Sequence, residues 1–204
     1  MSLNRVKVVG FDPSEIKVVG FDPSLRNFGV VKASINIGSL QVRVDSVQLI
    51  QPSLDKTAKK TVRKNSDDLR RARWLQSNMI LSCKDCSFAM IEMPVGSQSA
   101  RAMTSYGIVV GVLSSCPLPI IEVTPTEVKL AGAGDKKASK QEMIDWAVSE
   151  HSEAKWLRRK SKGEMILMNG NEHIADALAA IYAGINTEQF KTALSIYRQM
   201  NLAA

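Results

Sequence analysis

The chain has 204 residues, a length that accommodates one domain or two small ones. Hydrophobic residues make up 45% of it and charged residues 23%, which excludes collagen-like, disordered and acidic-tail proteins. No apolar run approaches the roughly 20 residues of a membrane-spanning helix, and the N-terminal apolar stretch is too short for a signal peptide. Three cysteines (Cys83, Cys86 and Cys116) are too few for a disulfide scaffold. We therefore expect a cytoplasmic protein that does not enter a membrane.

Positive charge is the first indication of a partner. Lys and Arg outnumber Asp and Glu by 27 to 20, and 13 of the 27 lie in two short segments, 55–74 and 155–162. A basic excess is typical of proteins that bind a polyanion such as nucleic acid. Two solvated loops would give the same pattern, so the charge alone does not decide the function.

The N-terminus contains a repeat. The octet KVVGFDPS occurs at 7–14 and again at 17–24. A perfect repeat this short is not a solenoid unit and indicates a recent duplication or a cloning scar. Only the second copy continues into a long apolar segment, so we expect residues 1–16 to form a loose extension and 17–204 a single domain. For the same reason Asp22 is favoured over Asp12 as a functional residue.

The predicted elements begin with three strands, at 17–21, 28–35 and 41–50, the last joined to its neighbour as an antiparallel hairpin. Helices are predicted at 67–82, 99–115, 140–151 and 171–186, with short buried strands at 88–91 and 120–124. Asn171 is predicted to cap the last helix. Three strands followed by strand–helix alternation describe an α/β fold with a mixed central sheet of about five strands flanked by helices.

Four side chains form a candidate site. Asp22 and Glu92 each come directly after an apolar strand, and His173 and Asp176 lie three apart on one face of the last helix. Singly, they read as an Asp-Pro turn, an exposed strand end, and an acidic first turn with a surface histidine. Together they are hard ligands suited to Mg²⁺ or Mn²⁺. Two such ions would activate a water and stabilise the leaving oxygen of a phosphodiester.

These residues lie in segments that resemble the RuvC family of Holliday junction resolvases, within the RNase H-like superfamily. The segments are VVGFDPSLRNFGVV at 18–31, FAMIEMP at 88–94, VTPTEVKLAGAGDKKASKQEM at 123–143 and NEHIADALAAIYAG at 171–184. They follow the family's order, and the third is the most specific. The resemblance implies an RNase H-like fold, a homodimer, and cleavage of four-way junctions or other branched DNA with two Mg²⁺ ions per site, for which Mn²⁺ substitutes.

The resemblance also implies roles for single residues. The four side chains of the candidate site correspond to the family's metal ligands and catalytic residues. Lys129 and Lys140 correspond to catalytic lysines near the scissile phosphate. We expect seven cations to bind the nucleic acid; they are Lys129, Lys136, Lys137, Lys140, Arg158, Arg159 and Lys160.

Two positions depart from the family's commonest pattern. His173 stands where many members have aspartate, so we expect lower activity below about pH 6.5, where an ordinary histidine gains a proton. After Glu92, many cellular members carry an aromatic residue that stacks on a base, whereas residues 93–96 here read MPVG. This difference predicts a nuclease of broader branched-DNA specificity, as in some viral relatives.

Other interpretations remain open from the sequence. Cys83 and Cys86 have zinc or redox spacing, but no second pair follows. Trp156 lies among cations, where it could stack on a base, although packing against the sheet is favoured. The basic surface would also suit a branched nucleic-acid-binding protein without catalysis, and an RNA-directed nuclease of the same superfamily is a further alternative. An actin-like phosphotransferase needs two lobes, for which 204 residues leave little room.

Overall fold

A computed structural model describes residues 14–52 and 64–202 of the chain. Its central sheet has five strands in the order β3-β2-β1-β4-β5. These strands are β1 (Glu15–Asp22), β2 (Phe28–Asn36), β3 (Val42–Ile50), β4 (Phe88–Glu92) and β5 (Ile120–Val123). The first three pair antiparallel, whereas β4 runs parallel to both β1 and β5. The predicted mixed sheet is therefore confirmed.

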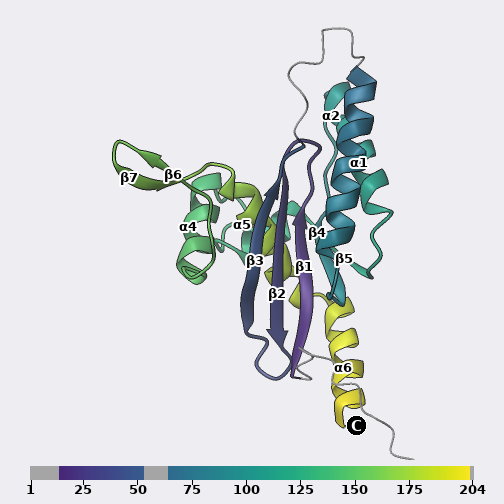
Figure 1. Cartoon of the computed structure of the whole chain (residues 1–204). Coiled ribbons are helices and arrows are strands. Elements are labelled where there is room, and N and C mark those ends of the chain that lie inside the picture. Colours follow the sequence, from purple (N-terminus) through teal and green to yellow (C-terminus); the bar gives the residue numbers. More distant parts are fainter. Residues whose placement is uncertain (1–13, 53–63, 203–204) are drawn as a thin grey trace, which may run out of the picture.

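Helices cover both faces of this sheet. They are α1 (Lys64–Ser82), α2 (Ala100–Leu113), α3 (Pro125–Ala131), α4 (Lys140–Glu150), α5 (Asn171–Ile185) and α6 (Glu188–Leu202). Figure 1 shows α1 and α2 on one side of the sheet and α4 and α5 on the other. A separate hairpin of β6 (Arg158–Ser161) and β7 (Glu164–Leu167) projects from the body beside α4. None of the helices described is long and apolar enough to cross a membrane.

The alternation of side chains along β1 explains the two layers. Ile16 and Val18 belong to the core under α5, whereas Val19 and Phe21 belong to the core under α1 and α2. Helix α5 is buried almost all round, because the sheet covers one side and α3 and α4 cover the other. Its many alanines let these neighbours approach closely. Helix α5 therefore lies at the centre of the fold.

Several elements differ from the prediction. β1 begins at Glu15, so Glu15 and the fully buried Ile16 belong to the sheet and not to a loose extension; residues 1–13, with Asp12, lie outside the described part. Asn171 does not cap α5, because its side chain is bonded to the backbone of Leu157. Helices α3 and α6 and the β6–β7 hairpin were not predicted. The short α3 begins directly after β5, with a reciprocal capping box between Thr124 and Glu127.

Candidate active site

Asp22 and Glu92 lie side by side at one edge of the sheet. They are the last residues of β1 and β4, which are neighbouring parallel strands. The final pair in that register is Phe21 with Ile91, so Asp22 and Glu92 occupy the next position on each strand. Because carboxyl ends of parallel strands meet at the same edge, two acids far apart in sequence become neighbours.

Two glycines bring α5 to the same edge. A Cβ on Gly29 of β2 would lie 1.9 Å from the backbone oxygen of His173, and one on Gly20 of β1 would lie 2.1 Å from that of Ala177. No other residue type fits where a helix backbone approaches a strand this closely. Since Gly29 pairs with Asp22, the first turn of α5 is held directly over the end of β1.

His173 and Asp22 are in direct contact. The Nδ1 of His173 lies 2.6 Å from Oδ2 of Asp22, and the two side chains are 19% and 16% exposed. The turn that follows Asp22 is held by Ser24 and Asn27, which exchange hydrogen bonds. The Asp22 carboxylate therefore forms no hydrogen bond within the turn that follows it. Burial alone would lower the pKa of His173, but the hydrogen bond and charge of Asp22 outweigh it and raise that pKa above 6.5.

Glu92 and Asp176 are half-buried acids without partners. Neither carboxylate has a hydrogen bond or an ion pair to another residue that the structure describes. Burial, together with the charges of Asp22 and Asp176, raises the pKa of Glu92 from 4.5 to about 8. Burial and the charge of Asp22 likewise raise the pKa of Asp176 from 3.8 to about 7. Three carboxylates thus share one field that the nearby cations compensate only in part.

Two lysines reach this group from α3 and α4. Lys129 is half-buried in the last turn of α3, and its charge opposes the raised pKa of both Glu92 and Asp176. Lys140, the first residue of α4, places its Nζ 2.8 Å from Oε1 of Glu172, which raises the pKa of the lysine. The same Glu172 oxygen lies 3.4 Å from Nε2 of His173. Glu172 was not predicted as a site residue; its position next to His173 in the sequence was the available signal.

The donor set fits a hard divalent ion, but its arrangement is not that of a coordination sphere. Carboxylate oxygens and an imidazole are suitable ligands for such an ion. A bound cation would also offset the repulsion between the carboxylates, which raises the pKa values of Glu92 and Asp176. Within 14–52 and 64–202, however, no three His, Cys, Asp or Glu side chains are placed to hold a metal ion as they stand. Asp22 instead faces His173. Metal binding therefore requires these side chains to turn toward one another.

Comparison with known proteins identifies the fold. No protein-family model matches the chain, and no curated protein sequence does. Among solved structures, Thermus thermophilus RuvC is similar over 88% of this chain and 97% of its own, at 20% identity and a TM-score of 0.57. The same enzyme in complex with Holliday junction substrate matches over 88% and 96%, at 18% identity and a TM-score of 0.58.

The fold is that of RuvC. The RNase H-like fold and the RuvC resemblance expected from the sequence are confirmed at this level. A Fowlpox virus resolvase with its substrate Holliday junction DNA also matches, over 88% of this chain and 99% of its own, at 14% identity and a TM-score of 0.49.

The other predicted nucleic-acid ligands lie on two parts of this RuvC fold. Lys136 and Lys137 are exposed in the connection between α3 and α4. Arg158, Arg159 and Lys160 lie on β6 of the projecting hairpin. Trp156, just before that hairpin, is only 6% exposed and donates its indole N–H to the backbone oxygen of His151. Packing, and not base stacking, is thus the role of this tryptophan.

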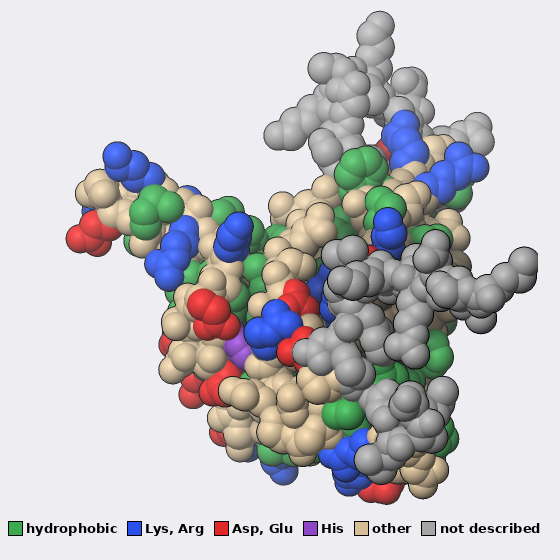
Figure 2. Space-filling model, turned by 60° about the horizontal axis from the view of Figure 1, so that its bottom comes forward, with side chains coloured by type: hydrophobic (Ala, Val, Ile, Leu, Met, Phe, Trp, Pro, Cys, Tyr) green, Lys and Arg blue, Asp and Glu red, His purple; other side chains and the backbone are tan. Residues whose placement is uncertain are grey.

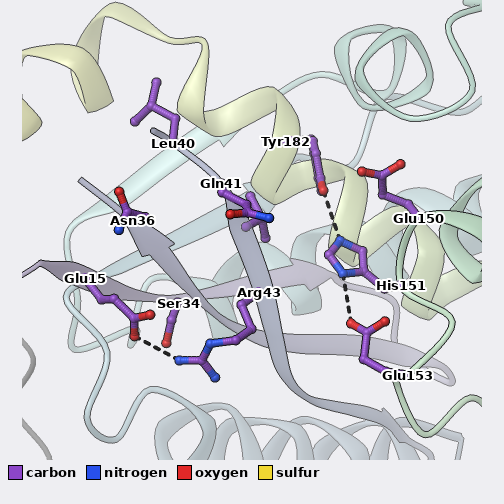
Figure 3. Close-up of a pocket in the computed structure, with 11 residues that line it drawn as sticks. Glu15, Ser34, Asn36, Leu40, Gln41, Arg43, Glu150, His151, Glu153 and Tyr182 are labelled. Atoms are coloured by element: carbon purple, nitrogen blue, oxygen red, sulfur yellow. Dashed lines mark hydrogen bonds and ion pairs between the residues drawn. The ribbon is translucent and has the colours of Figure 1, made fainter. Parts of the chain in front are cut away.

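The second histidine belongs to a different place on the RuvC fold. Figure 3 shows a cavity of about 550 Å³ that is lined by Glu15, the first residue of β1. It therefore lies at the opposite end of that strand from Asp22. His151 there is bonded to Tyr182 and lies 3.3 Å from Glu153, while Arg43 pairs with Glu15. None of the predicted site residues lines this cavity. The cavity is therefore separate from the acidic site and adds no ligand to it.

Proposed function

We propose that this protein is a divalent-metal-dependent endonuclease that cuts four-way junctions or other branched DNA. The observation that carries the proposal is the pair of unpartnered acids, Glu92 and Asp176, beside Asp22 at one edge of the sheet. The RuvC fold supports the same conclusion, because Thermus thermophilus RuvC is known in complex with Holliday junction substrate. A net charge of +7 suits a DNA substrate.

The chain's own residues divide the work of the reaction. Asp22, Glu92 and Asp176 would hold the ions, and His173 would add a neutral imidazole. Bound divalent ions lower the pKa of a water and stabilise the leaving oxygen of the phosphodiester. Lys129, held by α3 close to the acids, would orient the scissile phosphate through its positive charge. The side chain of Lys140 is 79% exposed. It would leave its ion pair with Glu172 to contact a phosphate.

A cleavage assay separates this function from its alternatives. Purified protein with Mg²⁺ or Mn²⁺ is offered a four-way junction, a flap, a linear duplex and a single strand of DNA. The proposal expects metal-dependent cuts in the branched substrates, absent in EDTA. Binding without cutting would favour a non-catalytic DNA-binding protein, and preferential cutting of an RNA copy of the same substrate would favour an RNA-directed nuclease.

Metal binding should release protons and strengthen as the pH rises. Glu92 and Asp176, with pKa values of about 8 and 7, retain protons near neutral pH, and ligation requires their ionised forms. His173 must likewise lose its proton, and its raised pKa moves that loss above pH 6.5. Calorimetric titration with Mn²⁺ in two buffers of different ionisation enthalpy measures the protons released. An affinity that stays constant between pH 6 and 8.5 would contradict this expectation.

Asp176→Asn should stabilise the metal-free protein. Because the folded pKa is raised above 3.8, unfolding in neutral solution releases a proton from Asp176, and the stability that the protonated acid provides is lost as the pH rises toward 7. An asparagine, neutral at every pH, removes this loss. We expect a gain on the order of 1 kcal/mol or more in EDTA, or a few degrees in Tm, larger at pH 8 than at pH 5. Equal Tm values at pH 8 would contradict the raised pKa.

We also propose that two copies pair through α1 and α2, since a four-way junction presents two strands to be cut and one chain carries one site. Half of the large exposed hydrophobic side chains in the described residues lie on these two helices; they are Leu69, Trp74, Ile80, Leu81, Met103 and Val110. Apolar surface gathered in this way is typical of an interface. Light scattering should give twice the 22.4 kDa of one chain, and L69E/M103E should give one chain.

A further inference from the structure

The β6–β7 hairpin is a basic ribbon that stands away from the body. Its two strands pair with each other and not with the central sheet. Figure 1 shows it projecting beside α4, and Figure 2 shows Lys and Arg side chains along the same projection. The hairpin carries four exposed cations and one acid, Glu164; the cations are Arg158, Arg159, Lys160 and Lys162. A short exposed ribbon has no core of its own, so its charged side chains are accessible to a partner.

These four cations have no partner among the described residues of the protein. They form no ion pair and no side-chain hydrogen bond with any residue in the described ranges. In contrast, cations elsewhere on the surface are paired, such as Lys191 with Glu188 and Arg43 with Glu15. Free guanidinium and ammonium groups on a projecting element are suited to phosphate oxygens.

The geometry of the ribbon fits a DNA groove. A two-residue turn closes it, with Lys162 at φ +48° and Gly163 at φ +92°, the left-handed pair typical of tight hairpins. Four residues per strand at about 3.3 Å each give a reach of about 13 Å. The major groove of DNA is about 12 Å wide and about 8.5 Å deep, so a two-stranded ribbon of this length can enter it and reach its floor. Arg158 and Lys160 point from one face of the ribbon and Arg159 from the other, so that cations face both sides of a groove.

The root of the ribbon is fixed to the candidate active site. The side chain of Asn171, fully buried at the start of α5, bonds both the backbone N–H and the backbone oxygen of Leu157, at 2.9 and 2.8 Å. The backbone N–H of Met168 donates to the same oxygen at 3.0 Å, which closes the ring at the base of the hairpin. Asn171 is two residues before His173. The direction of the ribbon is therefore set by the same helix turn that places His173.

We propose that the β6–β7 hairpin binds a second duplex arm of a branched DNA while the strand to be cut lies over the start of α5. This inference rests on the proposed function and adds to it the element that distinguishes branched from linear DNA. A straight duplex bound at the acidic site follows the surface of the body, whereas an arm that leaves the branch point runs along the ribbon. All the cations of the ribbon then contact phosphates only when the DNA is branched.

The test removes the charge of the ribbon without touching the acidic site. R158Q/R159Q/K160Q is compared with wild type and with K17Q/K84Q/K191Q, which removes the same charge from exposed positions at the other end of the sheet and on α6. Fluorescence anisotropy in EDTA measures binding to a four-way junction and to a linear duplex of the same sequence at several salt concentrations. The Tm of each variant confirms that it is folded.

The ribbon variant should bind the junction at least about tenfold more weakly, and the salt slope of log K should fall by about 2–3, near 0.9 per lost phosphate contact. Its affinity for the linear duplex should change much less, and the control variant should resemble wild type with both DNAs. Unchanged junction binding, or an equal loss on both DNAs, would overturn the role of the ribbon. If wild type cuts no junction but the ribbon effect on binding remains, only the nuclease proposal fails.

Discussion

Asp22→Asn is expected to slow metal-dependent cleavage of a four-way junction by about 10³-fold or more, which corresponds to about 4 kcal/mol of lost transition-state stabilisation. Asparagine keeps the size of the side chain and can still face His173 Nδ1, so the fold should persist. The substitution removes the negative charge by which Asp22 raises the pKa values of Glu92 and Asp176. The attraction for a divalent ion weakens, while the basic surfaces that bind DNA are unchanged.

Asp145→Asn is the matched control for this variant. Asp145 is an exposed acid on α4, and among the residues that the structure describes its side chain is bonded to Gln141 alone, one turn away. The substitution changes the charge by the same amount. Its cleavage rate should equal that of wild type within about twofold, as for most surface changes. Gel shifts in EDTA should show junction binding by both variants. An Asp22→Asn protein that cuts at the wild-type rate would remove Asp22 from the site.

Gly29→Ala is expected to lower the free energy of unfolding by about 3 kcal/mol or more and to lower cleavage with it. The new Cβ would lie 1.9 Å from the oxygen and 2.4 Å from the carbon of the His173 carbonyl, and both are backbone atoms of a buried helix. Neither can move without displacing the first turn of α5. His173 would then leave Asp22, and Asp176 would leave Glu92.

Gly96→Ala is the control for Gly29→Ala, because a Cβ at Gly96 meets nothing within 4 Å. It should leave stability unchanged or raise it by up to about 1 kcal/mol. Urea unfolding measures both variants. A Gly29→Ala protein as stable as wild type, with wild-type activity, would show that the close approach of α5 to β2 does not position the site.

The strands and long helices could be predicted because their residues carry regular signals. The apolar run of β1 and the 3.6-residue period of apolar residues in α5 predict both elements close to their observed bounds. Helix α6 carries a similar signal in Phe190, Leu194 and Tyr197, which pack against the core at helical spacing. The sequence thus carries the signal for α6 as well.

The β6–β7 hairpin could not be read in the same way. Its strands have four residues each and no buried face, so RRKS and EMIL show no alternation between core and solvent. The burial pattern that identifies strands exists only where a sheet covers a core. The charge run in 155–162 is visible in the sequence, but the ribbon that presents it depends on the contact of Asn171 with Leu157, which are 14 residues apart in the chain.

The composition of the candidate site was predictable, but its geometry was not. Strand ends and helix starts indicated which acids would meet, and the RuvC resemblance selected among them. The pairing of Asp22 with His173, and of Lys140 with Glu172, depends on how closely α5 approaches the sheet. That distance is set by Gly20 and Gly29, whose importance follows only from the atoms they face.

The most direct test of the shared metal site is an anomalous difference map from crystals soaked in Mn²⁺ at pH 8. We expect manganese at the ends of β1 and β4, about 2–2.5 Å from oxygens of Asp22 and Glu92, with Asp176 turned toward it from α5. The hydrogen bond between Asp22 and His173 would then be rearranged. A map with manganese elsewhere, or with none at these carboxylates while Asp22 still faces His173, would contradict it.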